Sequence, residues 1–227
     1  MALMKKGCKG EDVRAVQEGL TALGIDCGPI DGKFGKKTKA GVEAFQRQNA
    51  LKVDGIVGPI TDGALEAKLK NLYPEPKTEH YSLADINICR PALRHLWQDL
   101  PVKYYPNAQK VLERMELVRE KLLRTWPYAV LQVRNGYRPE AYNKQVGGAR
   151  KSRHLYGQAV DLMCKTDVIQ YVPNCYQIGV LCLALFNEDG GLGLGSNTNV
   201  HMDIREKKTR WYYTYKTMKA WEKNQQY

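Results

Sequence analysis

Two short apolar segments of this chain carry ionisable residues at alternating positions, and this pattern restricts the fold more than any other. The segments are GQAVDLMC, residues 157–164, and NVHMDI, residues 199–204. Alternation along a strand places Asp161 on one face of the first, and His201 and Asp203 together on one face of the second. Burying a carboxylate or an imidazole in a sheet is costly unless it is paired or bound to a metal ion. We therefore expect two strands whose polar side chains are paired or metal-bound.

A third ionisable residue stands close in sequence to the first segment. His154 lies seven positions before Asp161, and His201 follows forty positions after it. Two imidazole nitrogens and one carboxylate oxygen form a ligand set for zinc. Catalytic zinc sites typically have three protein ligands and a water in the fourth position, whose pKa the metal lowers toward neutrality. The alternative interpretation is an internal hydrogen bond between histidine and aspartate without a metal ion.

The residues around these three form a longer pattern. It consists of Gly136-Tyr137-Arg138, then Ser152-x-His154-x-x-Gly157-x-Ala159-x-Asp161, then His201-x-Asp203-x-Arg205. Over roughly residues 79–215 it resembles the zinc D-alanyl-D-alanine carboxypeptidase family, peptidoglycan peptidases that cut bonds beside D-amino acids. The resemblance implies that His154, Asp161 and His201 are zinc ligands. It also implies that Arg138 contacts the substrate or the polarised carbonyl oxygen.

The general base of that family has no direct counterpart here. Its members commonly carry an acidic residue three positions before the last ligand, where this chain has Thr198. Asp203 is the substitute candidate, because it shares a strand face with His201. Its competing role is to orient a ligand rather than to move protons. Glu188 or Asp189, in the NEDGG loop, are further candidates for the base.

The N-terminal region contains an internal repeat. Asp31–Thr38, DGKFGKKT, recurs as Asp54–Thr61, DGIVGPIT, after a shift of 23 positions. Each copy is typical of a glycine turn followed by a helix start, and an earlier apolar stripe from Val13 to Leu23 predicts a preceding helix. These patterns predict a small three-helix bundle over residues 1–70, which resembles the peptidoglycan-binding domain found beside many wall hydrolases.

The rest of the chain predicts a second domain of the α+β class. Residues 71–78 contain two prolines and form a short linker, and residues 79–227 form a zinc peptidase domain with a small antiparallel sheet. Helices are expected at 106–126 and 168–187, with strands at AVLQVRNGY and RWYYTYK, the latter a wall for the substrate. The glycine-rich DGGLGLG is expected to be a flexible rim or a turn. Loop 140–153 carries Arg150, Lys151 and Arg153, which either meet the carboxylates of a stem peptide or are simply solvated.

The net charge bears on which molecules the protein could bind, and the cysteine pattern bears on whether it contains disulfides. The chain has 35 basic and 24 acidic residues, a net charge of +11. No zinc finger, RNP-like motif or arginine-rich arm points to nucleic acid. Peptidoglycan and possible anionic wall polymers therefore fit this positive charge better than nucleic acid does. The alternative is that the basic residues form an ordinary solvated surface without a binding role. The six cysteines show no CxxC pair, and most are expected to be free thiols.

The sequence also bears on where the protein acts. No segment is long and apolar enough to span a membrane, and MALMKKGCKG lacks the apolar core of a secretory signal. We expect a monomer that is made in the cytoplasm and reaches the cell wall after lysis, through holes made by a partner protein of the holin type. Secretion is the alternative if a signal peptide has been removed.

Together these features predict a zinc-dependent, endolysin-like peptidoglycan hydrolase that cleaves a stem-peptide or cross-link bond next to a D-amino acid. A wall-binding domain without a visible signal favours lysis, and hence an endopeptidase. One alternative is a D-Ala-D-Ala carboxypeptidase that trims the stem peptide. The other is a non-catalytic wall-binding protein, which Thr198 at the acidic position favours.

Overall fold

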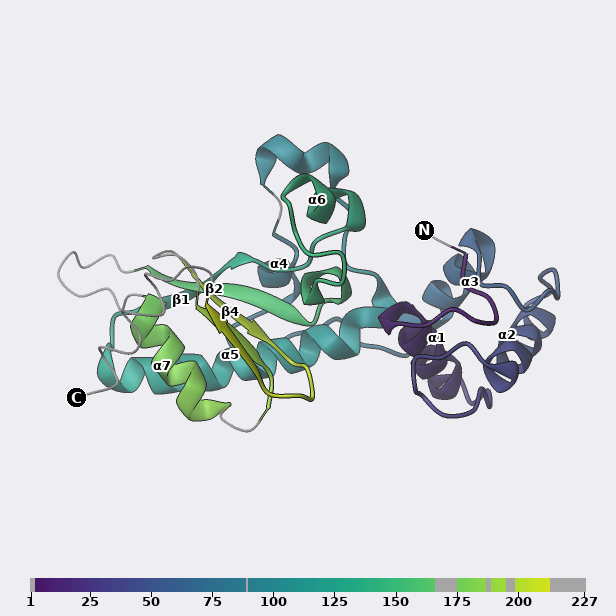
Figure 1. The fold of residues 1–227 in the computed structure, drawn as a ribbon, viewed down its shortest axis with the longest axis horizontal. Coiled ribbons are helices and arrows are strands. Elements are labelled where there is room, and N and C mark those ends of the chain that lie inside the picture. The colour runs from purple at the N-terminus through teal and green to yellow at the C-terminus, as the bar shows by residue number, and fades with distance from the viewer. Residues whose placement is uncertain (1–2, 89, 166–174, 187–188, 195–198, 213–227) are drawn as a thin grey trace. The chain divides into compact units, whose positions relative to one another are not determined.

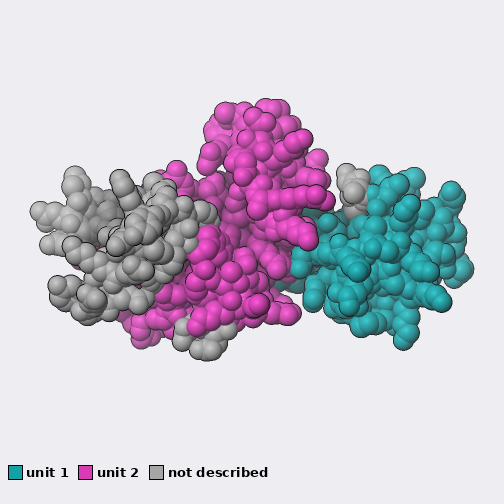
Figure 2. All heavy atoms as spheres, in the orientation of Figure 1, with its two compact units in different colours: residues 1–74, 101–106 teal, residues 75–100, 107–227 magenta. Residues whose placement is uncertain are grey.

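The computed structural model describes residues 3–88, 90–165, 175–186, 189–194 and 199–212. The chain forms two compact units, one of residues 1–74 with 101–106 and the other of residues 75–100 with 107–227 (Figure 2). The first unit is helical and the second combines helices with a sheet (Figure 1). The expected α+β class with a helical N-terminal region is therefore confirmed.

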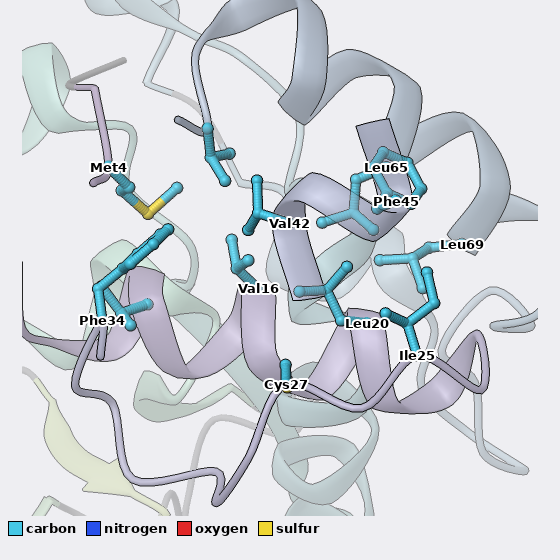
Figure 3. Close-up of a cluster of buried hydrophobic side chains, with 12 residues drawn as sticks. Met4, Val16, Leu20, Ile25, Cys27, Phe34, Val42, Phe45, Leu65 and Leu69 are labelled. Atoms are coloured by element: carbon cyan, nitrogen blue, oxygen red, sulfur yellow. The ribbon is translucent and has the colours of Figure 1, made fainter. Parts of the chain in front are cut away.

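Three helices build the first unit: α1 (Glu11–Ala22), α2 (Lys36–Gln48) and α3 (Pro59–Lys70). Each buries one apolar stripe, and Figure 3 shows the stripes meeting in one core. Its centre contains Val16, Leu20, Phe45, Leu65 and Leu69, all at most 1% exposed. The helical periodicity in the sequence predicted this core correctly.

A buried glutamine holds the second copy of the repeat in place. The side-chain nitrogen of Gln46 lies 3.0 Å from Asp54 Oδ1, 3.0 Å from the Ile56 carbonyl oxygen and 3.1 Å from Thr61 Oγ1. Its Oε1 accepts a hydrogen bond from the backbone N–H of Gly55 at 2.9 Å. Gly55 has a φ of +68°, a conformation that favours glycine. The DG turn is thus tied to the preceding helix.

The first copy repeats this arrangement around Gln17. Its Nε2 lies 3.2 Å from Asp31 Oδ1 and 3.0 Å from Thr38 Oγ1, and its Oε1 accepts from the Gly32 N–H at 2.8 Å. Gly32 has the same φ of +68°. The repeat therefore has a structural role: in each copy the aspartate, glycine and threonine contact a buried glutamine, and these contacts hold the turn.

The short 3-10 helix η2 (Val102–Tyr104) also belongs to the first unit. The ammonium group of Lys103, whose residue is only 5% exposed, lies 2.9 Å from Asp62 Oδ1 on α3. The Val102 N–H donates to Glu66 Oε2 at 2.6 Å. The sequence pattern does not indicate this contribution, because Val102 and Lys103 lie 36 and 41 positions after their partners on α3.

The second unit contains a five-stranded sheet in the order β1-β2-β4-β3-β5. Its strands are β1 (Val130–Asn135), β2 (Ala159–Lys165), β3 (Gly191–Leu194), β4 (Val200–Asp203) and β5 (Thr209–Tyr212). The helical elements are α4 (Leu83–Ile86), η1 (Pro91–Leu96), α5 (Tyr105–Thr125), α6 (Glu140–Gln145), η3 (Arg153–Tyr156) and α7 (Cys175–Leu185). The expected strands at β1, β2 and β4 are confirmed.

Two details of the sheet differ from the prediction. The pairs β1/β2, β2/β4 and β3/β4 are antiparallel, but β3/β5 is parallel, so the sheet is mixed. The glycine-rich segment expected as a rim or turn instead supplies strand β3. Its alternating glycines leave room for side chains of the neighbouring strands, a feature that only the paired sheet reveals.

One face of the sheet is apolar and packs in the core, and the other carries ionisable side chains. Val160, Leu162, Val200 and Met202 are completely buried on one face. Helix α5 runs along the sheet (Figure 1) and buries an apolar stripe that includes Val111, Met115, Val118 and Leu122, each fully covered. The opposite face of β2 and β4 carries Asp161, His201 and Asp203. Among the described residues, no helix combines the length and apolar character needed to cross a bilayer.

The glutamine contacts predict that Gln46→Met destabilises the first unit. Methionine keeps the approximate size of the side chain but removes every hydrogen bond, which leaves the Gly55 N–H and the threonine hydroxyl without this partner. We expect the free energy of unfolding to fall by about 2 kcal/mol or more. Denaturant-dependent hydrogen exchange of the α1–α3 amides in the full chain measures it.

The matched control is Gln48→Met, on the exposed side of the same helix. It should change the unfolding free energy by no more than about 0.5 kcal/mol. Equal effects of the two substitutions would contradict the role assigned to Gln46.

Candidate metal centre

Three side chains converge on the polar face of the sheet, His154 from η3, Asp161 from β2 and His201 from β4. His154 Nε2 lies 3.1 Å from His201 Nδ1 and 3.3 Å from Asp161 Oδ1, and His201 Nδ1 lies 3.1 Å from the same oxygen. Ligands about 2.0–2.1 Å from a tetrahedral ion would be roughly 3.3 Å apart. The spacing of these three donor atoms therefore fits a zinc ion.

Both histidines present the nitrogen that such an ion needs. His154 Nδ1 lies 2.7 Å from the carbonyl oxygen of Gly136, which can only accept, so Nδ1 carries the proton and Nε2 faces the other two donors. His201 Nε2 lies 3.1 Å from Asp203 Oδ2, which leaves Nδ1 directed at Asp161. Outer partners of this kind fix the tautomer and the ring orientation of metal-binding histidines.

Asp203 is completely buried and both of its oxygens are engaged. Oδ1 accepts from the Gly191 N–H at 2.9 Å and from Arg205 Nε at 2.8 Å. Oδ2 accepts from the Arg205 guanidinium at 2.5 Å and lies beside His201. A Cβ atom added at Gly191 would stand 2.3 Å from Asp203 Oδ2, so glycine is required there for this carboxylate to fit.

Asp161 is held from its other side as well. Asn135, at the end of β1, donates from Nδ2 to Asp161 Oδ2 at 2.9 Å, while Oδ1 faces the histidines. One guanidinium nitrogen of Arg138 lies 3.8 Å from Asp161 Oδ2, and its backbone N–H donates to the His154 carbonyl oxygen at 3.0 Å. The sequence reasoning missed Asn135, although it directly precedes the recognised Gly136-Tyr137-Arg138 turn.

The protonation states suit a site for a cation. Burial raises the pKa of Asp161, but the adjacent His154 and His201 outweigh it and hold that pKa well below its usual range. Burial lowers the pKa of His154 more than Asp161 raises it, so this ring is neutral at neutral pH. Burial also works against a charged His201, yet hydrogen bonds to Asp161 and Asp203 raise its pKa. Positive charge is thus favoured among these groups, as a proton or as a metal ion.

The residues of the site lie side by side on neighbouring strands and form one row across the sheet. Asn135, Asp161, His201, Gly193 and Trp211 are successive partners from β1 across to β5. A Cβ atom at Gly193 would lie 2.4 Å from the Trp211 ring, which shows that the indole occupies this space. The ring centroids of Trp211 and His201 are 5.0 Å apart. The glycine lets the indole reach the histidine and close one end of the row.

A cleft of about 620 Å³ opens above this row. Its lining includes His154, Asp161, His201, Arg138 and Trp211, so the structure brings the three candidate ligands, the predicted arginine and part of the expected aromatic wall together. Asp203 lies beneath it, behind His201.

The other acidic candidates are less favourably placed. Asp189 forms an ion pair with Arg114 and is not among the residues that line the cleft. Glu188 and Thr198 lie outside the described residues. The described part of the chain therefore brings no second carboxylate besides Asp161 into the lining of the cleft.

Comparisons with known proteins identify similar sequences for both parts of the chain. Residues 9–65 match the family model "Putative peptidoglycan binding domain", and residues 80–183 match "Peptidase M15". Zinc D-Ala-D-Ala carboxypeptidase of Streptomyces albus G is 32% identical over 166 residues, 70% of this chain and 60% of that protein. N-acetylmuramoyl-L-alanine amidase CwlL of Bacillus licheniformis is 39% identical over 67 residues, 29% of this chain and 19% of the amidase. The chain thus spans less than two thirds of either curated relative.

Among solved structures, the N-terminal domain of SleB is 34% identical, with a TM-score of 0.29, over 30% of this chain and 92% of its own.

The contacts of Asp203 predict a stability loss that depends on pH. In metal-free protein, Asp203→Asn should lower the free energy of unfolding by at least about 2 kcal/mol at pH 7, because the buried Arg205 contacts lose their charged acceptor. His201 and Arg205 lower the folded-state pKa of Asp203 despite its burial. A carboxyl group with a lowered folded pKa stabilises the fold above its unfolded pKa of about 3.9 and loses this contribution as pH falls further.

The difference between wild type and Asp203→Asn should therefore shrink as pH falls below about 4. Urea unfolding with a chelator present, at pH 7 and at pH 3, measures both values. An equal difference at the two pH values would show that the charge of Asp203 does not stabilise the fold.

Proposed function

We propose that this chain is a zinc-dependent peptidoglycan peptidase, because residues 80–183 match the Peptidase M15 family model and residues 9–65 match a peptidoglycan-binding family model. It cleaves a stem-peptide or cross-link bond next to a D-amino acid. The observation that carries the proposal is the spacing of 3.1–3.3 Å among His154 Nε2, Asp161 Oδ1 and His201 Nδ1. These atoms are the proposed zinc ligands.

The proposed division of labour follows the two sequence matches. In this proposal residues 1–70 bind the cell wall, residues 71–78 connect the two domains, and residues 79–227 form the domain that hydrolyses the peptide bond. The protein acts as a monomer at the cell wall, reached after lysis or by secretion, and the net charge of +11 favours contact with anionic wall polymers there.

In this mechanism, zinc bound by the three residues would supply a Lewis acid and lower the pKa of a water molecule. The protein groups hold the geometry. Asn135 keeps Asp161 Oδ2 turned away from the histidines, so that Oδ1 faces them. The Gly136 carbonyl does the same for His154. Arg138 places a positive charge beside Asp161, where it stabilises a developing oxyanion or anchors the substrate.

For Asp203 we propose the positioning role rather than that of general base. Its side chain is completely buried, and its oxygens are occupied by Gly191, Arg205 and His201. A general base must reach the water from which it takes a proton. Glu188 is then the remaining acidic candidate for the base, because Asp189 is paired with Arg114.

Removal of the metal should abolish hydrolysis. We expect purified peptidoglycan incubated with the protein to release peptide products that disappear with a chelator and return when zinc is added, because in this mechanism zinc would supply the Lewis acid and lower the pKa of the attacking water. Mass spectrometry of the products measures this and identifies the bond. Loss of a terminal D-Ala alone would establish the carboxypeptidase alternative. No product, with the protein still pelleting with the wall, would establish the non-catalytic alternative.

Substitution of a ligand should separate cutting from binding. His154→Ala or Asp161→Ala should abolish product formation and zinc binding, while pelleting with peptidoglycan remains because residues 1–70 are unchanged. The matched control is His95→Ala, an exposed histidine outside the cleft lining, which should keep wild-type activity and zinc content. A ligand variant that still cuts would overturn the assignment of that ligand.

A further inference from the structure

The cleft over the candidate metal centre is strongly cationic. Its lining contains Arg90, Arg134, Arg138, Lys151, Arg153 and Arg205, and Asp161 is the one carboxylate among the lining residues described. Like charges gathered around a concave site repel one another, so they do not stabilise the fold. They do attract and orient a negatively charged ligand.

Several of these cations have partners in the protein. Arg205 is bound to Asp203, Arg153 donates to Gln158 Oε1 at 2.7 Å, and Arg138 stands beside Asp161. Arg134 and Lys151 differ from them. Both are exposed, and neither forms an ion pair with an acidic residue in the described part of the chain. Their charges are therefore available to a ligand.

The position of Arg134 follows from an irregularity in β1. Val133 pairs with Leu162 and Asn135 with Asp161, so Arg134 is the extra residue of a bulge between them. Bulges are known to redirect a side chain next to a functional site. Here the bulge brings both Asn135 and Arg134 to the cleft, one to hold Asp161 and the other to line the wall.

Lys151 lines the same cleft from the segment between α6 and η3. Asn143 of α6 holds this segment in place. Its Nδ2 donates to the Ala149 carbonyl oxygen at 3.0 Å, and a Cβ atom at Gly148 would lie 2.1 Å from its Oδ1. The close packing of Gly148 against Asn143 holds the loop that carries the lysine. Lys151 is thus presented by an anchored segment.

The strand order sets the distance at which these cations act. β1 lies one strand from β2 and two strands from β4, and neighbouring strands are about 4.8 Å apart. The backbone of Arg134 is therefore about 5–10 Å from the strands that carry Asp161 and His201. An extended peptide advances about 3.3 Å per residue. The backbone of Arg134 is therefore about two or three extended residues away, and its long side chain, which lines the cleft, can meet a group one or two residues from the scissile bond.

We propose that Arg134 and Lys151 are specificity-determining residues that bind a free carboxylate of the stem peptide, one or two residues from the scissile bond. This inference rests on the proposed peptidase function and adds the chemistry by which the substrate is selected. Arg134 supplies planar paired donors that suit a carboxylate, and Lys151 supplies a point charge. Trp211 closes the opposite end of the row, where the cation Arg205 is already paired with Asp203, so the carboxylate of the peptide is directed to the Arg134 end.

The test compares two synthetic stem peptides that differ in one group, a free carboxylate or its carboxamide on the residue next to the scissile bond. We expect the zinc-loaded wild-type chain to cleave the carboxylate peptide with a kcat/KM about 10- to 100-fold higher. Arg134→Gln and Lys151→Gln should each reduce this ratio, and the double variant should bring it below about threefold. Lys121→Gln, on the exposed side of α5, is the matched control and should keep the wild-type ratio.

A second measurement separates this inference from the proposed function. Calorimetric binding of the same two peptides to the zinc-free chain should show the same preference and the same loss in the double variant, whether or not the loaded protein cleaves either peptide. Failure to cleave peptidoglycan or peptides would overturn the peptidase function alone.

Two outcomes would overturn the carboxylate-binding inference. One is equal binding and cleavage of the two peptides by the wild-type chain. The other is a double variant that pellets less with whole cell wall but keeps its preference for the carboxylate peptide, which would assign these cations to an anionic wall polymer instead.

Discussion

The buried pair of Asp161 and His201 is the constraint on which the second unit depends. The two residues face each other directly across β2 and β4, with His201 Nδ1 3.1 Å from Asp161 Oδ1. Unpaired burial of either group would be costly, and a shift of register by one residue would send both to the apolar face. The pairing therefore determines the register of the central strands, and Val160 and Met202 are directed into the core as a consequence.

Each group of the centre is in turn held by a second one, and these outer contacts explain much of the surrounding sequence. The carbonyl of Gly136 orients His154, Asn135 holds Asp161, and Asp203 holds His201. Asp203 needs Arg205 to balance its buried charge. The site thus extends beyond three ligands to a connected set of hydrogen bonds that hold each ligand in place.

Glycine has a specific use in this sheet. Gly191 and Gly193 alternate along β3, and the spaces where their side chains would stand are filled by Asp203 and Trp211. A residue with a Cβ atom at either position would displace the carboxylate that orients His201 or the indole that packs against it. The sequence predicts a flexible rim or a turn for this glycine-rich segment, and glycine does weaken isolated strands. Pairing with β4 and β5 makes it a strand, since its bare face accommodates the neighbours.

The sequence by itself determined the elements and the groups that are brought together. Helical periodicity located α1 and α5, alternation located β2 and β4, and motif spacing named His154, Asp161 and His201 before any coordinates, because these signals are local. Only the tertiary structure decided what depends on contacts between distant segments. Residues 102–104 join the helical unit through Lys103 and Asp62, the bulge in β1 brings Asn135 to the site, and burial leaves Asp203 without access to water. The environment of a side chain is set by the partners that fold around it, and no pattern along one segment contains them.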